Sequence, residues 1–403
     1  MTLSSYLVLT FAHFSVFVLM KICLTINSSP WSAFKGGGQL AVHHLACALS
    51  TKGYQVHVLY SKYPHEKFDI EVPYHVHWAR HRDFATVNLN ILSYSKVLAP
   101  LAEKEIFDII HGNAEEAYLA GKIARENNSA YVFTSHTPNI PTTGMLRGII
   151  NPIRFLKNIN TYLLRQAIVE ADRVVAFSQF SRDLIVKGLN DTSSDRVRVI
   201  PPGVGHSWFE VERKPPSGSR LLFWGRLEEE KGLSELFHAL KVVSKKIKDV
   251  KLTLVGEGNR SKEYKTLVAD LDLIDRVEFT GWLDNREIQN LVAKSSLGLF
   301  PSRIESFGLS VVEAMAAGLP VIAANGGAIP ENVEAGVTGM LVPVNDSDTL
   351  ARAIISALEN PQRAESLAKT AKVNVQQKFS WDRAADSMIN LYQQILPGFK
   401  GTT

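Results

Sequence analysis

Two glutamates eight positions apart, Glu305 and Glu313, stand on either side of the point where a helix is expected to begin. The stretch LGLFPSRIESFGLSVVEAMAAGLPVIAA over 297–324 predicts a strand, a loop, a helix ended by Gly318, and a second strand. The first N–H groups of a helix lack helical partners and lie at the positive end of its dipole, so they favour an anion. A carboxylate beside an anion suits an uncharged ligand rich in hydroxyls, because a carboxylate accepts several hydrogen bonds. The stretch therefore predicts a phosphate at the helix tip and a polyol on each side.

The predicted anion site consists of the backbone at Phe307, Gly308 and Leu309. Gly308 lets the main chain approach a ligand closely, because it has no side chain. The alternative is an ordinary solvated glutamate pair, since acidic residues are common near helix starts. Two glutamates at this spacing form a weak pattern alone, but the surrounding ESFGLSVVEAMAAGLPV makes it specific.

These residues need a βαβ unit to position them, because ligands bind at the carboxyl ends of parallel strands. The strands Leu297–Phe300 and Leu319–Ala324 and the helix Gly308–Ala317 supply one such unit. Further apolar runs predict the remaining strands of an α/β fold. They are Lys21–Ile26, Gln55–Tyr60, Phe107–His111, Ala130–Ser135, Ala171–Ser178, Arg196–Ile200, Leu221–Gly225, Lys251–Val255, Val277–Thr280 and Gly339–Val342.

Length and composition limit the class of protein. A chain of 403 residues with 45% apolar and 21% charged residues is typical of two globular domains. A formal charge of +4 gives no argument for nucleic-acid binding. The two cysteines, Cys23 and Cys47, lie in apolar surroundings and indicate a reducing compartment without a disulfide framework. The sequence has no Cys/His cluster with metal-ligand spacing.

Residues 2–20 carry no charge, and a membrane anchor or signal peptide is one interpretation. A positively charged start and a cleavage site are missing, and a strand is predicted directly afterwards at Lys21–Ile26. We therefore expect residues 1–19 to be an apolar extension that can be deleted without loss of folding or activity. A weak membrane contact is the second interpretation, so we expect a cytoplasmic protein with a possible peripheral contact at the inner membrane face.

Glycines precede the first long helix in the run Gly36-Gly37-Gly38. A glycine loop between a strand and a helix allows phosphate to approach the backbone. The dinucleotide fingerprint G-x-G-x-x-G is not matched, and the second strand ends in Tyr60-Ser61 without an acidic residue for a ribose. These features argue against a dehydrogenase.

Two histidines, His111 and His136, end predicted strands at the edge where ligands bind. A lone histidine there is more often structural than catalytic. Of the two, His136 in TSHTPN is the better candidate for a catalytic residue. No acidic residue occurs between Asn127 and Val169, where basic and apolar residues alternate. An ordinary amphipathic helix is the favoured interpretation of that stretch, and a basic surface for an anionic acceptor or membrane is the alternative.

A stretch rich in Pro and Gly at 201–203 and 215–218 predicts the domain boundary. We expect a first domain over 20–207, a second over 208–380, and a C-terminal helix over 381–403. The second domain opens with a strand that ends in Gly-Arg, followed by a lysine at a predicted helix start. Arg226 and Lys231 would place two cations where they can face a diphosphate.

The stretch ESFGLSVVEAMAAGLPV resembles the E-x7-E motif of retaining glycosyltransferases with the GT-B fold, in particular glycosyltransferase family 4. The resemblance covers about residues 20–395 and implies two Rossmann-like domains that face a cleft. It implies that Glu305 contacts the donor sugar and Glu313 the nucleotide ribose. The other implied contacts are Gly37, Gly38, Arg226, Lys231, Phe307, Gly308 and Leu309 near the donor phosphates, Leu283 near the base, and His136 at the donor sugar or acceptor. Gly205-His206 departs from the family, which usually has an acidic residue there.

The resemblance implies transfer of a hexosyl unit from a nucleotide-diphosphate sugar to a hydroxyl of a glycan, lipid or small molecule. It also implies retention of anomeric configuration, with no cofactor. We expect no divalent metal, because no Asp-x-Asp ends a predicted strand while Arg226 and Lys231 are present. An epimerase of the same fold and a non-catalytic nucleotide-sugar binding subunit are the alternatives. The presence of both cations and both glutamates argues against the second alternative.

Overall fold

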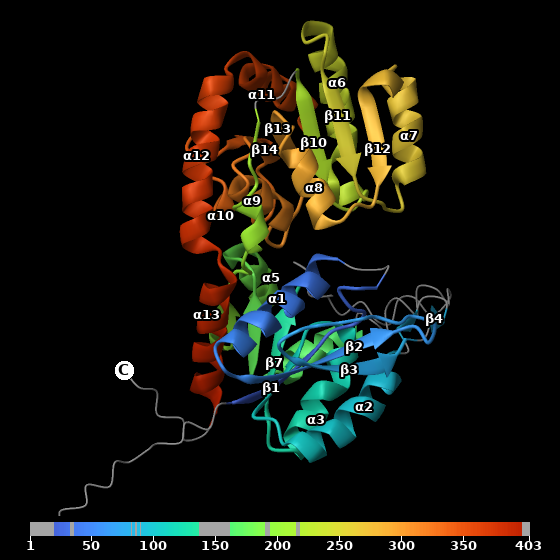
Figure 1. The fold of residues 1–403 in the computed structure, drawn as a ribbon, viewed down its shortest axis with the longest axis vertical. Helices are drawn as coiled ribbons and strands as arrows, with labels where there is room; N and C mark the ends of the chain where they lie inside the picture. Colours follow the sequence, from blue (N-terminus) through green and yellow to red (C-terminus); the bar gives the residue numbers. More distant parts are fainter. Residues whose placement is uncertain are drawn as a thin grey trace, which may run out of the picture.

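The computed structural model describes residues 20–32, 36–81, 83–84, 87–88, 90–136, 162–189, 194–214 and 218–396. Figure 1 shows two α/β lobes, one above the other. The N-terminal half of the chain, in blue to green, forms the lower lobe, and most of the C-terminal half, in yellow to red, forms the upper lobe. Each lobe contains one parallel sheet, and helices cover both faces of the sheet. The expectation of an α/β fold with two Rossmann-like domains is therefore confirmed.

The first lobe is built on a seven-stranded sheet in the order β3-β2-β1-β6-β7-β8-β9, and all its pairings are parallel. Its first strand, β1, lies inside the sheet. The chain first adds β2 and β3 on one side of β1 and then adds β6 to β9 on the other side, so the strand order reverses between β1 and β6. Such a reversal is where a doubly wound sheet opens a ligand crevice. The strands are β1 Lys21–Thr25, β2 Gln55–Lys62, β3 His75–Arg80, β6 Ile109–Gly112, β7 Ala130–Ser135, β8 Arg173–Ala176 and β9 Val197–Val199, with a small separate pair, β4 Asp83–Phe84 and β5 Val87–Asn88.

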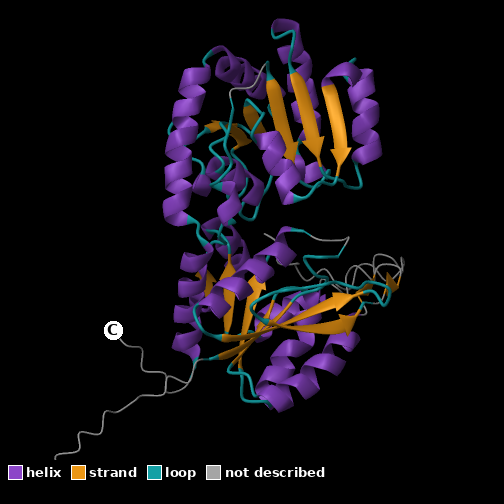
Figure 2. Cartoon of the chain, viewed as in Figure 1, coloured by secondary structure: helices purple, strands orange, loops and turns teal. Residues whose placement is uncertain are grey.

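The second lobe repeats this design with six parallel strands in the order β12-β11-β10-β13-β14-β15. Here the reversal lies between β10 and β13. Figure 2 shows the strand arrows of β10 to β12 pointing toward the first lobe, so their carboxyl ends face it. The strands are β10 Arg220–Trp224, β11 Lys251–Val255, β12 Val277–Gly281, β13 Leu297–Phe300, β14 Val321–Ala324 and β15 Met340–Val342.

Helices join most of the strands and cover the sheets. In the first lobe they are α1 Gly37–Thr51, α2 Asn90–Glu105, α3 Ala120–Glu126 and α5 Gln179–Gly188. In the second lobe they are α6 Leu233–Lys246, α7 Ser261–Asp270, α8 Asn285–Val292, α9 Leu309–Ala316, α10 Ile329–Asn332, α11 Ser347–Glu359 and α12 Pro361–Lys378. The last helix, α13 Trp381–Ile395, returns to the first lobe, where it lies beside α1 (Figure 1).

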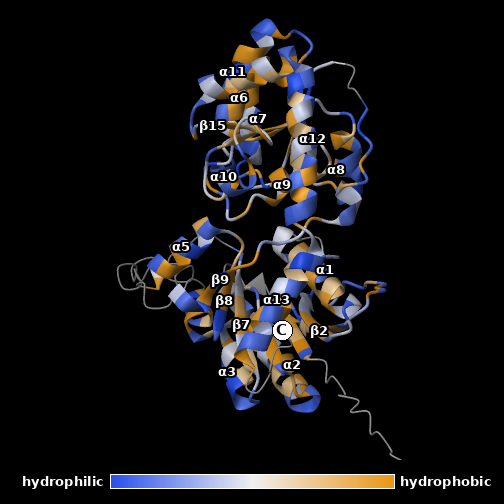
Figure 3. Ribbon diagram, turned by 90° about the vertical axis from the view of Figure 1, so that its left-hand side faces the viewer, coloured by the Kyte–Doolittle hydropathy of each residue, from blue (hydrophilic) through white to orange (hydrophobic). Residues whose placement is uncertain are grey.

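The first sheet has a separate apolar core on each face, because successive residues of a strand point to opposite sides. Ile22 and Leu24 pack with α1 and α13, whereas Cys23 between them packs with α2, α3 and α5. Buried strands of this kind read as continuous apolar runs, which explains why they are visible in the sequence. Figure 3 shows the complementary pattern in α12, which carries hydrophobic and hydrophilic positions together, as a helix with one face on the core must.

Most predicted strands are confirmed, and β7, β11 and β13 have the predicted bounds. The second strand of the central unit is shorter than predicted, since β14 begins at Val321. The predicted helix Gly308–Ala317 is α9, in which Gly308 is the N-cap and Ala317 the C-cap. The sequence analysis missed β3 and α12.

Among the described residues, no helix is long and apolar enough to cross a membrane. The apolar stretch 1–19 lies outside the described residues, as does most of the basic stretch, over 137–161. A peripheral membrane contact therefore stays a prediction.

Candidate active site

The loops after β10 and β13 meet at the reversal point of the second sheet. The loop after β10 contains the short 3₁₀ turn Glu229–Lys231, and the loop after β13 contains Glu305. The N–H of Arg303 donates to the carbonyl of Glu230 at 2.7 Å and ties the two loops together. The Arg303 guanidinium also pairs with Glu235, at 2.6 Å. These contacts give Glu305 and Lys231 a defined relative position.

Glu305 and Lys231 form a direct ion pair. The Lys231 Nζ donates to Glu305 Oε1 at 2.6 Å, and each side chain is only 14% exposed. A pair so shielded from water interacts more strongly than a surface pair, and it is destabilising to remove one partner alone. An anionic ligand at this place would offer the ammonium an alternative partner and would free the carboxylate to accept hydroxyl groups.

Two glycines shape the backbone around Glu305. Gly308 has φ of +83°, and a side chain there would also meet Ile329, since an added Cβ would lie 2.5 Å from its Cδ1. At Gly327, with φ of +60°, an added Cβ would lie 2.4 Å from the carbonyl oxygen of Glu305. Only glycine adopts these conformations and approaches without strain. The loop that carries Glu305 therefore packs directly against the backbone at Gly327 and ends at the start of α9.

Glu313 lies in the second turn of α9 and contacts the end of β10. Its Oε2 accepts a hydrogen bond from the indole Nε1 of Trp224 at 3.1 Å. Burial raises the pKa of the Glu313 carboxyl from its ordinary 4.5 to about 7, although the bond from Trp224 acts in the opposite direction. Partial burial therefore disfavours the charged form of this carboxyl, and hydrogen bonds donated by a polar ligand would favour that charged form.

This burial gives a first prediction, which concerns stability without ligand. The folded pKa of Glu313 lies above the unfolded value, so its ionisation costs stability as pH rises from 4.5 through 7, and the cost is absent below 4.5. Glu313→Gln keeps an acceptor for Trp224 and removes the ionisation. We expect it to raise Tm by roughly 2–4 °C at pH 8, on the order of 1 kcal/mol, with the difference shrinking toward pH 5. A melting series over pH 5–8 tests this, and a pH-independent decrease in Tm would contradict it.

On the facing edge of the first sheet, His136 follows β7 and Asn113 follows β6. Asn113 Nδ2 donates to the carbonyl of Thr25 at 3.1 Å, which orients its amide, and its Oδ1 lies 3.1 Å from His136 Nε2. An oxygen only accepts, so Nε2 carries the proton and Nδ1 is the acceptor of a neutral ring. Burial lowers the pKa of His136 to about 4, in agreement with a neutral imidazole. Its Nδ1 faces the glycine loop, since a Cβ added at Gly38 would lie 3.3 Å away.

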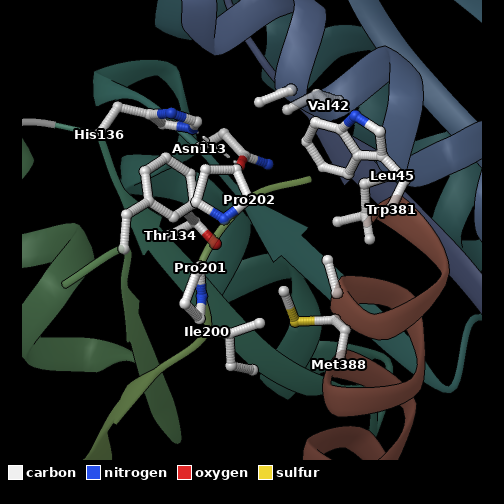
Figure 4. A pocket seen from close by; sticks show the side chains of 13 residues that line it. Val42, Leu45, Asn113, Thr134, His136, Ile200, Pro201, Pro202, Trp381 and Met388 are labelled. Carbon is white, nitrogen blue, oxygen red and sulfur yellow. Dashed lines mark hydrogen bonds between the residues drawn. The ribbon is translucent and has the colours of Figure 1, made fainter. Parts of the chain in front are cut away.

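A pocket of about 310 Å³, counting the solvent space at its mouth, opens beside His136. Figure 4 shows His136 and Asn113 joined by a hydrogen bond on one side and Trp381 and Met388 of α13 on the other. Pro201 and Pro202 of the segment that leads to the second lobe form part of the wall. The pocket is mainly apolar, with Asn113, Thr134 and His136 as its polar residues.

The carboxyl edge of the first sheet contacts the start of α9 in the second lobe. A Cβ added at Gly37 would lie 3.7 Å from Leu309 Cδ2, so the glycine loop of the first lobe faces the start of α9 in the second. The Ser306 hydroxyl donates to the carbonyl of His136 at 3.1 Å. The structure thus brings together predicted site residues that are far apart in the sequence: Gly37, Gly38, His136, Lys231, Glu305, Phe307, Gly308 and Leu309.

Other predicted residues lie differently. The Arg226 side chain is 72% exposed, and its guanidinium pairs with Glu230 at 3.0 Å rather than with the Glu305 loop. Leu283 is partly buried against the core of the second lobe. His111 is fully buried between Tyr392 and Thr134, with its ring nitrogens 2.6 and 2.7 Å from their hydroxyls, which confirms the structural interpretation of this histidine.

Sequence reasoning missed two residues of the site, Asn113 and Trp224. Both carry a local signal, since Asn113 stands one residue beyond the end of β6 and Trp224 is the last residue of β10. Both strands flank a reversal point, where a polar side chain or indole faces the crevice. No group of His, Cys, Asp and Glu in the described ranges is arranged to hold a metal ion.

Comparison with known proteins gives family matches along most of the chain. The family described as Glycosyltransferase Family 4 matches residues 35–208, and the family described as Glycosyl transferases group 1 matches residues 206–374. A D-inositol 3-phosphate glycosyltransferase of Saccharomonospora viridis is 27% identical over 319 residues, 74% of this chain and 73% of that protein. A phosphatidyl-myo-inositol mannosyltransferase of Mycolicibacterium smegmatis is 28% identical over 378 residues, 89% of this chain and 90% of that protein.

Solved structures share the fold. Sucrose-phosphate synthase from Thermosynechococcus elongatus matches with a TM-score of 0.76 at 23% identity, over 93% of this chain and 99% of that chain. HepE from Anabaena, solved in complex with UDP-glucose, matches with a TM-score of 0.71 at 21% identity, over 93% of this chain and 100% of that chain. Two family matches that together span residues 35–374, on a fold of two facing Rossmann-like lobes, show that the chain belongs to the family 4, group 1 glycosyltransferases of the GT-B fold.

Proposed function

We propose that this glycosyltransferase transfers a hexosyl unit from a nucleotide-diphosphate sugar to an acceptor hydroxyl, with retention of anomeric configuration. The observation that carries the proposal is the Lys231–Glu305 pair at the start of α9, opposite His136 and the glycine loop. A cation, helix amides and a carboxylate in one place suit a ligand that is anionic at one end and hydroxylated at the other. A nucleotide-diphosphate sugar has both ends.

In this proposal each residue has a role at the donor. Glu305 accepts hydrogen bonds from hydroxyl groups of the sugar. Glu313, which is hydrogen-bonded to Trp224, accepts hydrogen bonds from the hydroxyl groups of the ribose. Lys231, Arg226 and the amides of Phe307–Leu309 neutralise the diphosphate, Leu283 lies near the base, and Gly37 and Gly38 leave room for the phosphates. His136 borders the sugar and the acceptor through its ring.

The bond changes follow from these roles. The acceptor oxygen bonds to the anomeric carbon on the face from which the nucleoside diphosphate departs, and the bond from that carbon to the phosphate oxygen breaks. The acceptor proton passes to the leaving phosphate, so no separate base is needed. Charge that grows on the diphosphate is stabilised by Lys231, Arg226 and the α9 amides, and we propose that this suffices without a divalent ion.

The acceptor is a glycan, a lipid or a small molecule. Two of the similar proteins are named for inositol-based acceptors, and HepE was solved with UDP-glucose, so inositol compounds and UDP-glucose are the first to test. The epimerase and the non-catalytic binding subunit receive no support from the comparisons, whose named members are glycosyltransferases and synthases such as glycogen synthase. A cytoplasmic location stays a prediction.

A thermal-shift screen with UDP, GDP and ADP sugars tests the proposal first. A donor at 100 times its Kd should stabilise the protein by about 2.7 kcal/mol. NMR of the product then assigns the anomeric configuration. An inverted product would contradict retention, and an epimerised sugar formed from donor alone would favour the epimerase.

A further inference from the structure

The two lobes are joined by a glutamate at a helix start. Glu331 belongs to α10 of the second lobe, and its carboxylate receives the first two N–H groups of α5 in the first lobe. Gln179 N–H donates to Oε2 at 2.8 Å and Phe180 N–H to Oε1 at 2.7 Å. A carboxylate at a helix N-terminus satisfies unpaired donors and complements the positive end of the dipole. The first turn of α5 is thus completed by a residue 151 and 152 positions away in the chain.

Serine side chains add a second set of bonds between the lobes. The carbonyl of Ser306 accepts from the hydroxyls of Ser178 and Ser181 at 2.6 and 3.0 Å. The Ser306 hydroxyl donates to the carbonyl of His136 at 3.1 Å. Ser306 directly follows Glu305, so these three bonds hold the Glu305 loop against the first lobe.

Within the second lobe, Glu331 and the Ser306 loop are linked to each other by hydrogen bonds. Ala328 N–H donates to the carbonyl of Glu305 at 2.9 Å, and Glu331 N–H donates to the carbonyl of Ala328 at 3.0 Å. Asn332, beside Glu331, donates through its side-chain amide to the carbonyl of Phe307. Movement of α10 away from α5 would therefore carry Glu305 and the start of α9 with it.

We propose that Glu331, Ser178 and Ser181 form an interlobe clamp that sets the closed arrangement and positions Glu305 opposite His136 for the transfer step. The proposal of its catalytic effect rests on the function proposed above. Glu331 is exposed to solvent, so water can replace the α5 amides when the lobes separate. Glu331 is a positioning residue, since it acts through the Glu305 loop.

The test compares Glu331→Ala and Glu331→Gln with the control Glu334→Gln. Glu334 is an exposed glutamate of the same segment whose main chain contacts Thr338. Because the clamp acts on closure rather than on the donor contacts, we expect Glu331→Ala to lower kcat on the order of tenfold while donor Kd changes less than twofold. The kcat of Glu331→Gln should lie between those of wild type and Glu331→Ala, since the single carbonyl oxygen of glutamine replaces two carboxylate acceptors. The control should match wild type.

Two readouts do not depend on activity. In small-angle scattering of the ligand-free protein, Glu331→Ala should show a larger radius of gyration than wild type and Glu334→Gln. Hydrogen exchange at Gln179 and Phe180 should be faster in the Glu331 variants. Ser181→Ala keeps the Ser178 cap of α5, and it should also show a larger radius of gyration than wild type. Unchanged scattering and exchange in Glu331→Ala would overturn the clamp, even if no transferase activity is found. An expanded molecule with wild-type kcat would overturn its role in catalysis.

Discussion

Lys231→Ala should lower kcat about a hundredfold, equivalent to about 3 kcal/mol of transition-state stabilisation, because the departing diphosphate loses its least exposed cation. The variant should also lose about 1–3 kcal/mol of stability, since the Glu305 side chain would be left at a 14% exposed position without its ion-pair partner. Single-turnover kinetics and thermal melts measure the two effects separately.

Arg226→Ala is the matched comparison, because it removes the same charge from the same loop. Its guanidinium is exposed and paired with Glu230, an arrangement that contributes little to stability and is easily exchanged for a diphosphate. We expect a similar decrease in kcat with an unchanged Tm. Equal losses of Tm in the two variants would contradict the distinction between the buried and the exposed cation.

The same account predicts that wild-type activity persists in excess EDTA. Fixed cations and helix amides can take the place that Mg²⁺ or Mn²⁺ has in other transferases. Activity lost in EDTA and restored by Mn²⁺ would overturn this account of leaving-group stabilisation, together with the position of the diphosphate between Lys231 and the start of α9.

Glu305→Ala should lower turnover by at least about a hundredfold and leave donor affinity close to that of wild type. The sugar is the part of the donor that changes in the transition state, so contacts to it act mainly on kcat. Glu313→Ala should instead weaken donor binding about tenfold or more, because hydrogen bonds from ribose to a charged group are worth about 1.5–3 kcal/mol.

Glu313→Gln is the control for this comparison, since it retains an acceptor for the Trp224 indole and changes only the charge. Donor Kd from titration and kcat from product formation separate the two roles. An unchanged donor Kd in Glu313→Ala would show that this residue does not contact the ribose.

The sequence by itself determined the α/β class, most strands and the central βαβ unit. Strands such as Ala130–Ser135 and Leu297–Phe300 are buried or nearly so on both faces, so each is a short apolar run that can be recognised in the sequence. Elements without that signal were missed. The edge strand β3, HVHWAR, mixes polar and apolar residues, and α12 turns mainly alanines to the core, at Ala364, Ala368 and Ala371.

Only the tertiary structure decided which residues meet. The Lys231–Glu305 pair joins residues 74 positions apart, and Trp224 and Glu313 are 89 positions apart. Glu331 and the start of α5 are 151 and 152 positions apart and belong to different lobes. Local patterns record which face of a helix or strand is buried, whereas these contacts depend on strand order and on how two sheets face each other. The sequence therefore assigned each group to an element, whereas strand order within the second lobe and the packing of the two lobes determined its partner.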